Sequence, residues 1–340
     1  MNILLFISTY VGVVFFAWGI TAWTRQYALK RSILDLPNLR SSHSEPTPRG
    51  GGFSISIIAL ISVLVLWLSG YLSYQILLAI GCGGFLVSVV GWLDDKHNIA
   101  VIWRAISYLT ASAWAAYWVI YQNSAFNQFN YLIFGISLVS IAWMTNLYNF
   151  MDGSDALAAS QAVCTALIGG VLLMLADYTG LSLLLFILSA ACFGFLIWNW
   201  PPAKIFMGDV GSCFTGFIFA SVALIGSIEN IISIAVWLIL LSIFICDTSL
   251  TLMKRMFNGE KWYKAHRNHA YQLLIQSGMS HRQLVISLIL INSLLLLPLS
   301  FMAYSIDTYK WWITAGVYCC IGSVWGYIQL QCPPERRQSA

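Results

Sequence analysis

Long apolar runs recur along the whole chain, and they restrict its fold more than any other feature of the sequence. A helix that crosses the hydrocarbon core of a bilayer needs about 17–25 mainly apolar residues. About eleven such runs can be marked, at residues 3–23, 51–69, 75–93, 104–121, 131–147, 157–176, 182–198, 212–227, 231–250, 283–303 and 311–330. The sequence therefore predicts an all-α polytopic membrane protein with about eleven transmembrane helices.

Composition excludes a soluble protein. Of the 340 residues 59% are hydrophobic and only 9% are charged, whereas a soluble domain carries about 25% charged residues. Too few polar side chains remain to cover a water-facing surface. We expect one transmembrane domain over residues 1–340, with a short cytoplasmic tail at 331–340. The net charge of +4 is too small to suggest a nucleic-acid partner.

The positive charges predict how the chain is inserted, because cytoplasmic loops of membrane proteins carry an excess of Lys and Arg. If the N-terminus lies outside, every Lys and Arg except Lys310 falls on the inner side. The opposite orientation would place nearly all of them outside. We therefore predict that the N-terminus lies outside and the C-terminus inside, which agrees with an odd number of spans.

The acidic residues also have an uneven distribution. Asp177, Glu229 and Asp307 fall in short outer loops. Six aspartates fall at the inner ends of the apolar runs: Asp94, Asp95, Asp152, Asp155, Asp209 and Asp247. Charges at membrane depth are costly and are kept mostly for function. The sequence therefore predicts an active-site cleft at the cytoplasmic face.

Asp94 and Asp95 close the third apolar run. Adjacent carboxylates in one place of low dielectric constant repel each other unless a cation or a proton intervenes. Mg²⁺ or Mn²⁺, which take oxygen ligands, fits that need. The alternative is that both residues are solvated loop acids.

The segment from Asn146 to Asp155 lies between the fifth and sixth runs. If it is helical, Asn146, Asn149, Asp152 and Asp155 form one stripe at i, i+3 spacing, where their polar groups could bind a ligand. The Asp-Gly-Ser-Asp run that starts at Asp152 could equally cap the next helix, because Asp and Ser accept hydrogen bonds from free N–H groups.

A loop with Pro201, Pro202 and two glycines runs from Asn199 to Ser212 and contains Phe206 and Asp209. Prolines end a helix and glycines permit a close turn. The N–H groups at the start of the following helix would then form a phosphate cradle.

The long inner loop before residue 270 contains His266, Arg267 and His269. Two histidines at this spacing could ligate zinc, although no third ligand with suitable spacing is evident. Arg267 and the imidazoles could instead contact phosphate oxygens. A basic helix against anionic lipid is the third possibility.

Two more charged residues lie near the inner face. Arg49 follows a Pro-Thr-Pro run and supplies a cation next to three glycines. Asp247 ends the ninth run, with Thr251 and Arg255 on the same helix face. A structural ion pair and a substrate contact both remain open for Asp247.

Taken together, these segments resemble the polyprenyl-phosphate N-acetylhexosamine-1-phosphate transferase family (glycosyltransferase family 4), which shares a superfamily with the phospho-MurNAc-pentapeptide translocase. The resemblance runs from about residue 40 to 275, with the motifs in the family's order. The Pro-Thr-Pro-Arg-Gly-Gly run and the His-Ala-Tyr-Gln sequence that starts at His269 look most like the bacterial branch that initiates O-antigen or similar surface glycans. The translocase branch has three consecutive histidines, whereas Arg267 and Asn268 intervene here.

The resemblance implies an activity and its partners. Family members transfer a sugar 1-phosphate from a UDP-sugar to undecaprenyl phosphate, release UMP and need Mg²⁺. By that resemblance the chain would act at the cytoplasmic face of the bacterial inner membrane, on undecaprenyl phosphate and a UDP-N-acetyl sugar and within membrane lipid. Relatives in the family are often dimers, so both a monomer and a homodimer stay open. The sequence does not distinguish among the N-acetyl sugars.

The resemblance also implies residue roles. Asp209 would be the principal Mg²⁺ ligand, near Asp94 and Asp95, and Asp94 is the candidate for deprotonating the lipid phosphate. Positions that would line the nucleotide-sugar pocket are Arg104, Asn149, Asp152, Asp155, Asn199 and Phe206, with Asn146 and Arg49 as further substrate contacts. His266, Arg267 and His269 would lie near the phosphates.

An ion-coupled transporter is the main alternative from another class. Transporters place ionisable residues near the bilayer midplane, often in two related halves with broken helices. Here the acids lie at inner helix ends and no inverted repeat is evident. A scaffold would not need clustered acids, and the sequence after Asp152-Gly153 departs from the motif of CDP-alcohol phosphotransferases.

Overall fold

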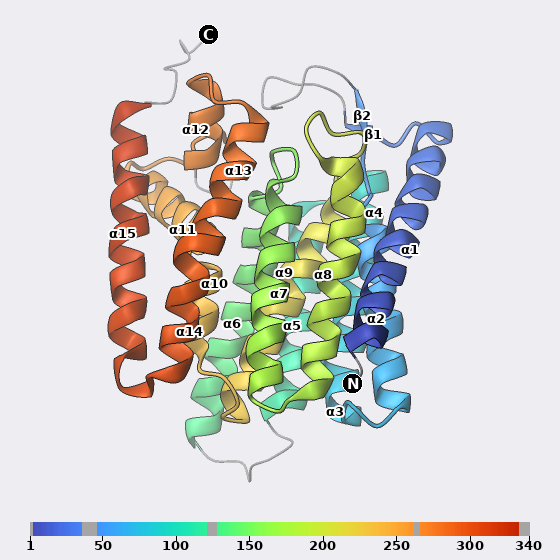
Figure 1. Ribbon diagram of the computed structural model, residues 1–340. Helices are drawn as coiled ribbons and strands as arrows, with labels where there is room; N and C mark the ends of the chain where they lie inside the picture. The colour runs from blue at the N-terminus through green and yellow to red at the C-terminus, as the bar shows by residue number, and fades with distance from the viewer. Residues whose placement is uncertain (1–2, 36–45, 121–127, 262–265, 333–340) are drawn as a thin grey trace.

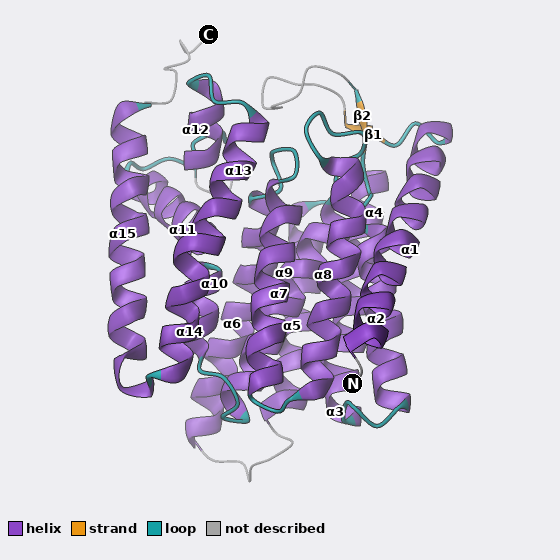
Figure 2. Cartoon of the chain, viewed as in Figure 1, coloured by secondary structure: helices purple, strands orange, loops and turns teal. Residues whose placement is uncertain are grey.

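The computed structural model describes residues 3–35, 46–120, 128–261 and 266–332 of the 340-residue chain. The described part is an upright bundle of helices (Figure 1) with one short two-stranded ladder at one end (Figure 2). In that ladder Leu34 pairs with Pro48 and Asp35 with Thr47, antiparallel. The start of α1 and the end of α15 lie at opposite ends of the bundle (Figure 1).

The elements follow the apolar runs. In chain order they are α1 (Ile3–Lys30), β1 (Leu34–Asp35), β2 (Thr47–Pro48), α2 (Phe53–Leu68), α3 (Tyr74–Ile76), α4 (Gly83–His97), α5 (Val101–Ile120), α6 (Gln128–Phe150), α7 (Leu157–Leu175), α8 (Thr179–Asn199), α9 (Asp209–Ile228), α10 (Ile234–Leu240), α11 (Ser242–Phe257), α12 (Ala270–Gln276), α13 (His281–Ile291), α14 (Leu297–Ser305) and α15 (Lys310–Gln331). Two π-helical stretches, η1 (Leu77–Cys82) and η2 (Asn292–Leu296), and a 3₁₀ turn, η3 (Asp307–Tyr309), join neighbouring helices.

The prediction of an all-α polytopic membrane protein is confirmed. Within the described residues, eight helical segments are long and apolar enough to cross a membrane, and the pair α10–α11 makes a ninth if it is counted as one span. The two other predicted spans are also helical. However, α2 has only 16 residues, and the 20-residue α5 is not among the eight. The total of eleven spans and the orientation therefore stay predictions.

The ninth predicted span is not one straight helix, which corrects the expectation for residues 231–250. The helices α10 and α11 meet at an angle of 78°. Gln161 of α7 lies buried at this break and donates to the carbonyl of Leu240, the last residue of α10, at 2.8 Å. Asn292, at the start of η2, donates in turn to Gln161 at 2.8 Å. This amide pair satisfies polar groups that apolar neighbours would leave unpaired.

The centre of the bundle is formed by α8 and α9, whereas α1 and α15 lie at its edges. In the spans of α8 and α9, 78% of the most apolar stretch is buried, against 6% for α1 and 17% for α15. Helix α9 packs against α2, α4, α5 and α6. Its first residues therefore lie among the ends of several helices.

The crossing of α4 and α9 is unusually close. A Cβ atom added at Gly91 of α4 would lie 2.6 Å from backbone atoms of Asp209 and Val210 in α9. Only glycine permits this approach. The acidic end of α4 is thereby held against the start of α9.

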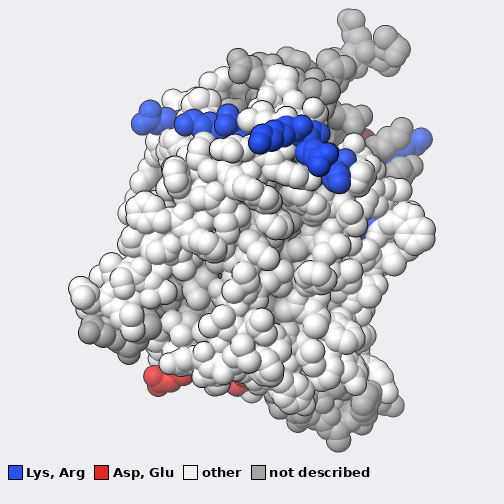
Figure 3. Space-filling model, turned by 90° about the vertical axis from the view of Figure 1, so that its right-hand side faces the viewer, with Lys and Arg blue, Asp and Glu red and all other residues white. Residues whose placement is uncertain are grey.

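Basic side chains gather toward one end of the face formed by α1, α2 and α4. Figure 3 shows Lys and Arg in a band across one end of the face formed by α1, α2 and α4, and acidic side chains at the opposite end. This distribution is the one from which the sequence predicted the orientation.

Candidate active site

Two carboxylates from distant parts of the sequence share one cation at the end of the bundle. Arg104, in the first turns of α5, donates from Nη1 to Oδ2 of Asp94 at 2.7 Å and to Oδ2 of Asp209 at 2.9 Å. Asp94 lies near the end of α4 and Asp209 starts α9. Arg104, predicted as a substrate contact, thus lies between two of the three predicted metal ligands.

The Oδ1 atoms of Asp94 and Asp209 also accept hydrogen bonds. Oδ1 of Asp94 accepts the backbone N–H of Ile99 at 2.6 Å. Oδ1 of Asp209 accepts from Nδ2 of Asn149 at 2.8 Å, and the same amide donates to Ser212 at 3.0 Å. The site is therefore preorganised by groups from α4, α5, α6 and α9.

Asp95 has a different position from its neighbour. It is 2% exposed, and its two oxygens accept the N–H groups of Asp209 and Val210 at 3.0 and 3.2 Å. These are the first two residues of α9, where the helix dipole favours a negative charge. Asp95 therefore anchors the start of α9 against α4.

The predicted phosphate cradle at the start of α9 is wrong. Asp95 occupies the first two N–H groups of this helix, and the N–H groups of Gly211 and Ser212 donate to the carbonyl of Gly208. Gly208 has φ +74°, and a Cβ there would lie 2.5 Å from Asp95. The glycine brings the loop against a carboxylate, and a phosphate has no free N–H to bind.

The carboxylates of Asp94 and Asp209 could supply only part of the ligands that Mg²⁺ needs. Mg²⁺ is usually bound by one or two carboxylates, with waters and substrate phosphates completing its shell. Asp94 and Asp209 meet at one point, where Arg104 already places a positive charge. The described residues hold no group of three or more His, Cys, Asp or Glu arranged for a metal ion, so a site made of protein ligands alone is not present there.

Only two of the four residues in the predicted polar stripe are helical, because α6 ends at Phe150. Asn146 and Asn149 are on the helix, and Nδ2 of Asn146 donates back to the carbonyl of Ala142 at 2.9 Å. The alternative, a side-chain cap on α7, is also wrong. The residue that precedes this helix is Ala156, and no side chain caps its first turn.

Asp152 lies in the turn beyond α6, close to the centre. Burial raises the pKa of the Asp152 carboxyl well above its usual range, and the carboxylates of Asp209 and Asp95 raise it further. The backbone N–H of Gly208 acts in the opposite direction. The neutral form of Asp152 is therefore more favoured than that of a solvated aspartate.

Asp155 and Asn199 connect neighbouring loops through hydrogen bonds to their backbone. Oδ2 of Asp155 accepts the N–H of Ala203 at 3.0 Å, and Nδ1 of His281 lies 3.7 Å from Oδ1. The amide of Asn199 accepts from the N–H of Ala156 at 2.8 Å and donates to the carbonyl of Ile205 at 2.9 Å. Both residues shape the turn around Asp152 by fixing the backbone.

The histidine segment is anchored by Asp247. Its carboxylate accepts the N–H groups of Ala270 and Tyr271 at 2.7 and 3.3 Å, and the hydroxyl of Thr251 at 3.2 Å. Nδ1 of the buried His269 lies 3.6 Å from the same carboxylate. Asp247 thus fixes the backbone that carries His269, and a substrate contact of Asp247 stays a prediction.

The suggested ion pair between Asp247 and Arg255 is not formed. Arg255 bonds to Glu260 at 3.1 Å and to the carbonyl of Lys261 at 3.1 Å. Burial, together with His269 and Arg255, lowers the pKa of His266 to about 3. The imidazole of His266 is therefore neutral at physiological pH and lies with its ring centre 4.9 Å from that of His269.

The aspartate cluster and the histidine segment meet at the end of α6. The hydroxyl of Tyr271 donates to the carbonyl of Phe150 at 3.1 Å, and Gly153 leaves room for the same hydroxyl. The rings of Phe150 and His269 are 6.5 Å apart. The two predicted groups of residues therefore belong to one site, joined through the turn that precedes Asp152.

Arg49 and Phe206 border this site. Nη2 of Arg49 donates to Oδ1 of Asn98 at 3.0 Å and approaches the carbonyl of Asp94 at 3.5 Å. The backbone of Phe206 bonds to Pro48 and Gly51, so the loop before α9 is joined to the strand before α2.

Sequence reasoning missed two residues of the site. Asn98 ends α4 with φ 50° and orients Arg49; an Asn just after a helix is a known sign of this left-handed conformation. His281 starts α13, and Nδ1 accepts from the backbone of Asp155 at 3.2 Å. No local sequence signal connects His281 with residues so far away in the chain.

Known proteins resemble this chain. Residues 76–227 match the family model described as Glycosyl transferase family 4. The chain is 31% identical over 290 residues to a probable undecaprenyl-phosphate N-acetylglucosaminyl 1-phosphate transferase of Bacillus subtilis, covering 80% of this chain and 78% of that protein. It is 29% identical over 312 residues to a decaprenyl-phosphate N-acetylglucosaminephosphotransferase of Mycolicibacterium smegmatis (81% and 75%). It is 26% identical over 343 residues to an undecaprenyl-phosphate alpha-N-acetylglucosaminyl 1-phosphate transferase of Yersinia pestis (96% and 92%).

Proposed function

Because this chain belongs to glycosyl transferase family 4, we propose that it transfers an N-acetylhexosamine 1-phosphate from a UDP-sugar to undecaprenyl phosphate and releases UMP. The product is a sugar linked to the lipid through pyrophosphate, and it initiates O-antigen or a related surface polysaccharide. The reaction takes place at the cytoplasmic face of the bacterial inner membrane. The names of the relatives support the lipid acceptor and the amino sugar.

The observation that best supports this function is the meeting of Asp94 and Asp209 on Arg104. Phosphoryl transfer between two anionic reactants depends mainly on positioning and on neutralising charge. A cation held between two carboxylates, at the basic end of a membrane bundle, provides both close to lipid phosphates.

In the proposed reaction an oxygen of the lipid phosphate attacks the β-phosphorus of the UDP-sugar. The new bond joins that oxygen to the β-phosphorus, while the bond from the β-phosphorus to the bridging oxygen breaks and UMP keeps this oxygen. Asp94 accepts the proton if the lipid phosphate arrives as a monoanion. Asp94 can do so only when Oδ2 is released from Arg104.

We infer that Arg104 changes partners when the substrate binds. A pyrophosphate offers the guanidinium more negative charge than either carboxylate alone. Arg104 would then stabilise the charge that develops on the leaving phosphate. Asp94 and Asp209 would be freed to act as base and as metal ligand.

Asp209 is the residue that would hold Mg²⁺, with Asn149 orienting it, while Asp94 acts as the base. When bound, the ion neutralises charge on the pyrophosphate oxygens. Asp95 supports this arrangement by holding the backbone of Asp209 in place. Asp152 lies next to these groups, and positive charge there would favour its ionised form.

The histidine segment completes the proposed site from the other side. Arg267 supplies positive charge near the phosphates, and His269 is held by the segment that Asp247 anchors. His266, neutral at physiological pH, can accept or donate one hydrogen bond rather than supply charge.

The test is UMP release from purified protein in detergent, with undecaprenyl phosphate, Mg²⁺ and a panel of UDP-N-acetyl sugars. We expect UMP only when acceptor and metal are both present, and none after addition of EDTA. Asp209→Asn should abolish turnover without unfolding the protein. Asp177→Asn is the matched control, since this exposed aspartate lies at the other end of α7, and it should retain full activity.

The best donor in the panel identifies the sugar. A folded protein that releases no UMP from any donor would contradict the proposed transfer. In that case uptake of an unmodified solute into proteoliposomes would support the alternative, an ion-coupled transporter.

A further inference from the structure

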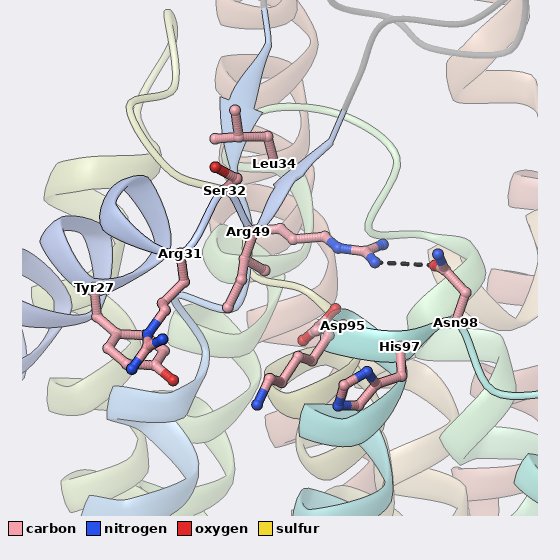
Figure 4. A pocket seen from close by; sticks show the side chains of 10 residues that line it. Tyr27, Arg31, Ser32, Leu34, Arg49, Asp95, His97 and Asn98 are labelled. Atoms are coloured by element: carbon pink, nitrogen blue, oxygen red, sulfur yellow. Dashed lines mark hydrogen bonds between the residues drawn. The ribbon is translucent and has the colours of Figure 1, made fainter.

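A second polar pocket lies beside the aspartate cluster, between the end of α1, β1 and the end of α4. Its volume is about 420 Å³, and Figure 4 shows the side chains around it. It is lined by Tyr27, Arg31, Ser32, Ile33, Leu34, Arg49, Asp95, Lys96, His97 and Asn98. The proposed reaction uses Asp95 but leaves the rest of this pocket without a role.

The charges in this pocket do not balance. Arg31, Arg49 and Lys96 line it, and within the described part of the chain neither Arg31 nor Lys96 has an ion-pair partner. The acid in the lining is Asp95, whose oxygens are already engaged with the start of α9. Nε of Arg49 is buried and makes no hydrogen bond with the residues that the structure describes. The pocket therefore attracts an anion.

Aromatic rings lie on the membrane side of this pocket. Tyr27, which lines it, stacks on Trp23 at 5.9 Å and lies 6.1 Å from Trp92. Phe53 joins the group, 5.3 Å from Trp92. Trp23 is 58% exposed on α1, a helix that faces the lipid along most of its length. An apolar surface thus leads from the bilayer to the basic pocket.

We propose that this pocket binds the phosphate head group of an anionic phospholipid from the surrounding leaflet. The cations would hold the phosphate, and an acyl chain would lie against Trp23 and its aromatic neighbours. A nucleotide or free phosphate would use the cations but not the aromatic surface, whereas a phospholipid uses both. The pocket lies at the end of the bundle where α1 leads into β1 (Figure 1), and its lining includes Arg31, Arg49 and Lys96, which suits the level of lipid head groups.

Lipid binding here would stabilise the end of α4. Asp95 and Lys96 are consecutive, and Arg49 joins the pocket to Asn98 at the end of the same helix. A phosphate on Arg31 and Lys96 would relieve the repulsion between these cations. The bound lipid would therefore hold in place the helix end that carries Asp94.

The experiment measures lipid binding without substrates, so its outcome does not depend on the proposed transfer. Protein in detergent is titrated with phosphatidylglycerol or phosphatidylcholine, and retained lipid is counted by native mass spectrometry. We expect one phosphatidylglycerol to be retained in preference to phosphatidylcholine. The double variant Arg31→Gln/Lys96→Gln should weaken its binding by roughly tenfold or more, from about 1 kcal/mol for each basic residue near a lipid surface.

Lys30→Gln is the matched control, because Lys30 is exposed next to Arg31 but does not line the pocket. An equal loss of phosphatidylglycerol binding in this variant would show a diffuse basic surface and overturn the proposal. So would displacement of the phospholipid by an equal amount of undecaprenyl phosphate, which would make the pocket the acceptor site. Thermal unfolding in phosphatidylcholine should be the same for wild type and both variants, which shows that the variants fold.

Discussion

The carboxylate of Asp95 accepts the backbone N–H of Asp209 at 3.0 Å, although the two residues are 114 positions apart. The side chain of Asp95 thus fixes the backbone position of Asp209. The contact holds the start of α9 at the end of α4, and Asp209 then faces Asp94 across Arg104. The three aspartates that the sequence predicted as metal ligands therefore have two different arrangements: two pair with Arg104, and the third fixes the backbone of α9.

Asp95→Asn should lower stability, whereas Asp209→Asn should lower activity alone. The amide at position 95 keeps one acceptor but turns its NH₂ toward the second N–H of α9. Losing a charge-assisted hydrogen bond in a buried position costs about 1.5–3 kcal/mol. Thermal unfolding in detergent and UMP release, measured on both variants, check this. Equal melting temperatures would show that Asp95 does not anchor α9.

Arg104→Gln should abolish turnover and also destabilise the protein, because it leaves two carboxylates facing each other without a cation. The loss in kcat should be about a hundredfold or more, as for other donors that stabilise transition-state charge. Adding Asp209→Asn to this variant should restore part of the stability. If the two changes are simply additive in unfolding free energy, the three side chains do not act as a unit.

Asp247→Asn should reduce kcat more than it changes KM for the UDP-sugar. The substitution weakens the bonds to Ala270 and Tyr271 and loosens the segment that carries His269, without removing a group expected to touch the substrate. Steady-state UMP release provides both constants. Glu260→Gln is the matched control, since it removes the partner of Arg255 at an exposed position, and it should behave as wild type.

His266 should make the protein sensitive to acid. Its pKa is lowered to about 3 in the folded state, against about 6.5 for an unperturbed histidine. Between these values the unfolded chain binds a proton that the folded protein does not, so stability falls as the pH drops below about 6.5 and is unaffected above it.

Melting temperatures at pH 7.5 and pH 5 test this effect. On acidification, His266→Gln should lose less stability than wild type. His97→Gln, at an exposed position at the end of α4, should follow wild type. Parallel losses in wild type and His266→Gln would show that His266 is not the group responsible.

The lengths of the apolar runs predicted most of the helices, because the length of such a run is a property of each segment alone. The run predicted at 157–176 is α7, Leu157–Leu175, and the run at 212–227 lies within α9. The break between α10 and α11 could not be predicted in this way. Both helices are apolar, and the bend is accommodated by Gln161 from another helix.

The sequence predicted which residues belong to the candidate site, but not how they contact one another. Residue type and depth marked Asp94, Asp209 and the histidine segment, since charges are rare at the ends of apolar helices. Whether an N–H at the start of α9 is free for phosphate depends on Asp95 from α4, and no local pattern contains that contact. For the same reason the phosphate cradle was predicted wrongly.

The sequence by itself determined that this chain is a helical membrane protein with its charged groups concentrated at one end. The length of an apolar run and the number of Lys and Arg residues beside it are properties of each segment, so they can be obtained from the sequence without knowledge of the fold. Only the tertiary structure decided that Arg104 joins Asp94 to Asp209, that Asp95 anchors α9 and that Asp247 supports His269. These are contacts between different helices, and their distances depend on how the helices pack, through close approaches such as the one at Gly91.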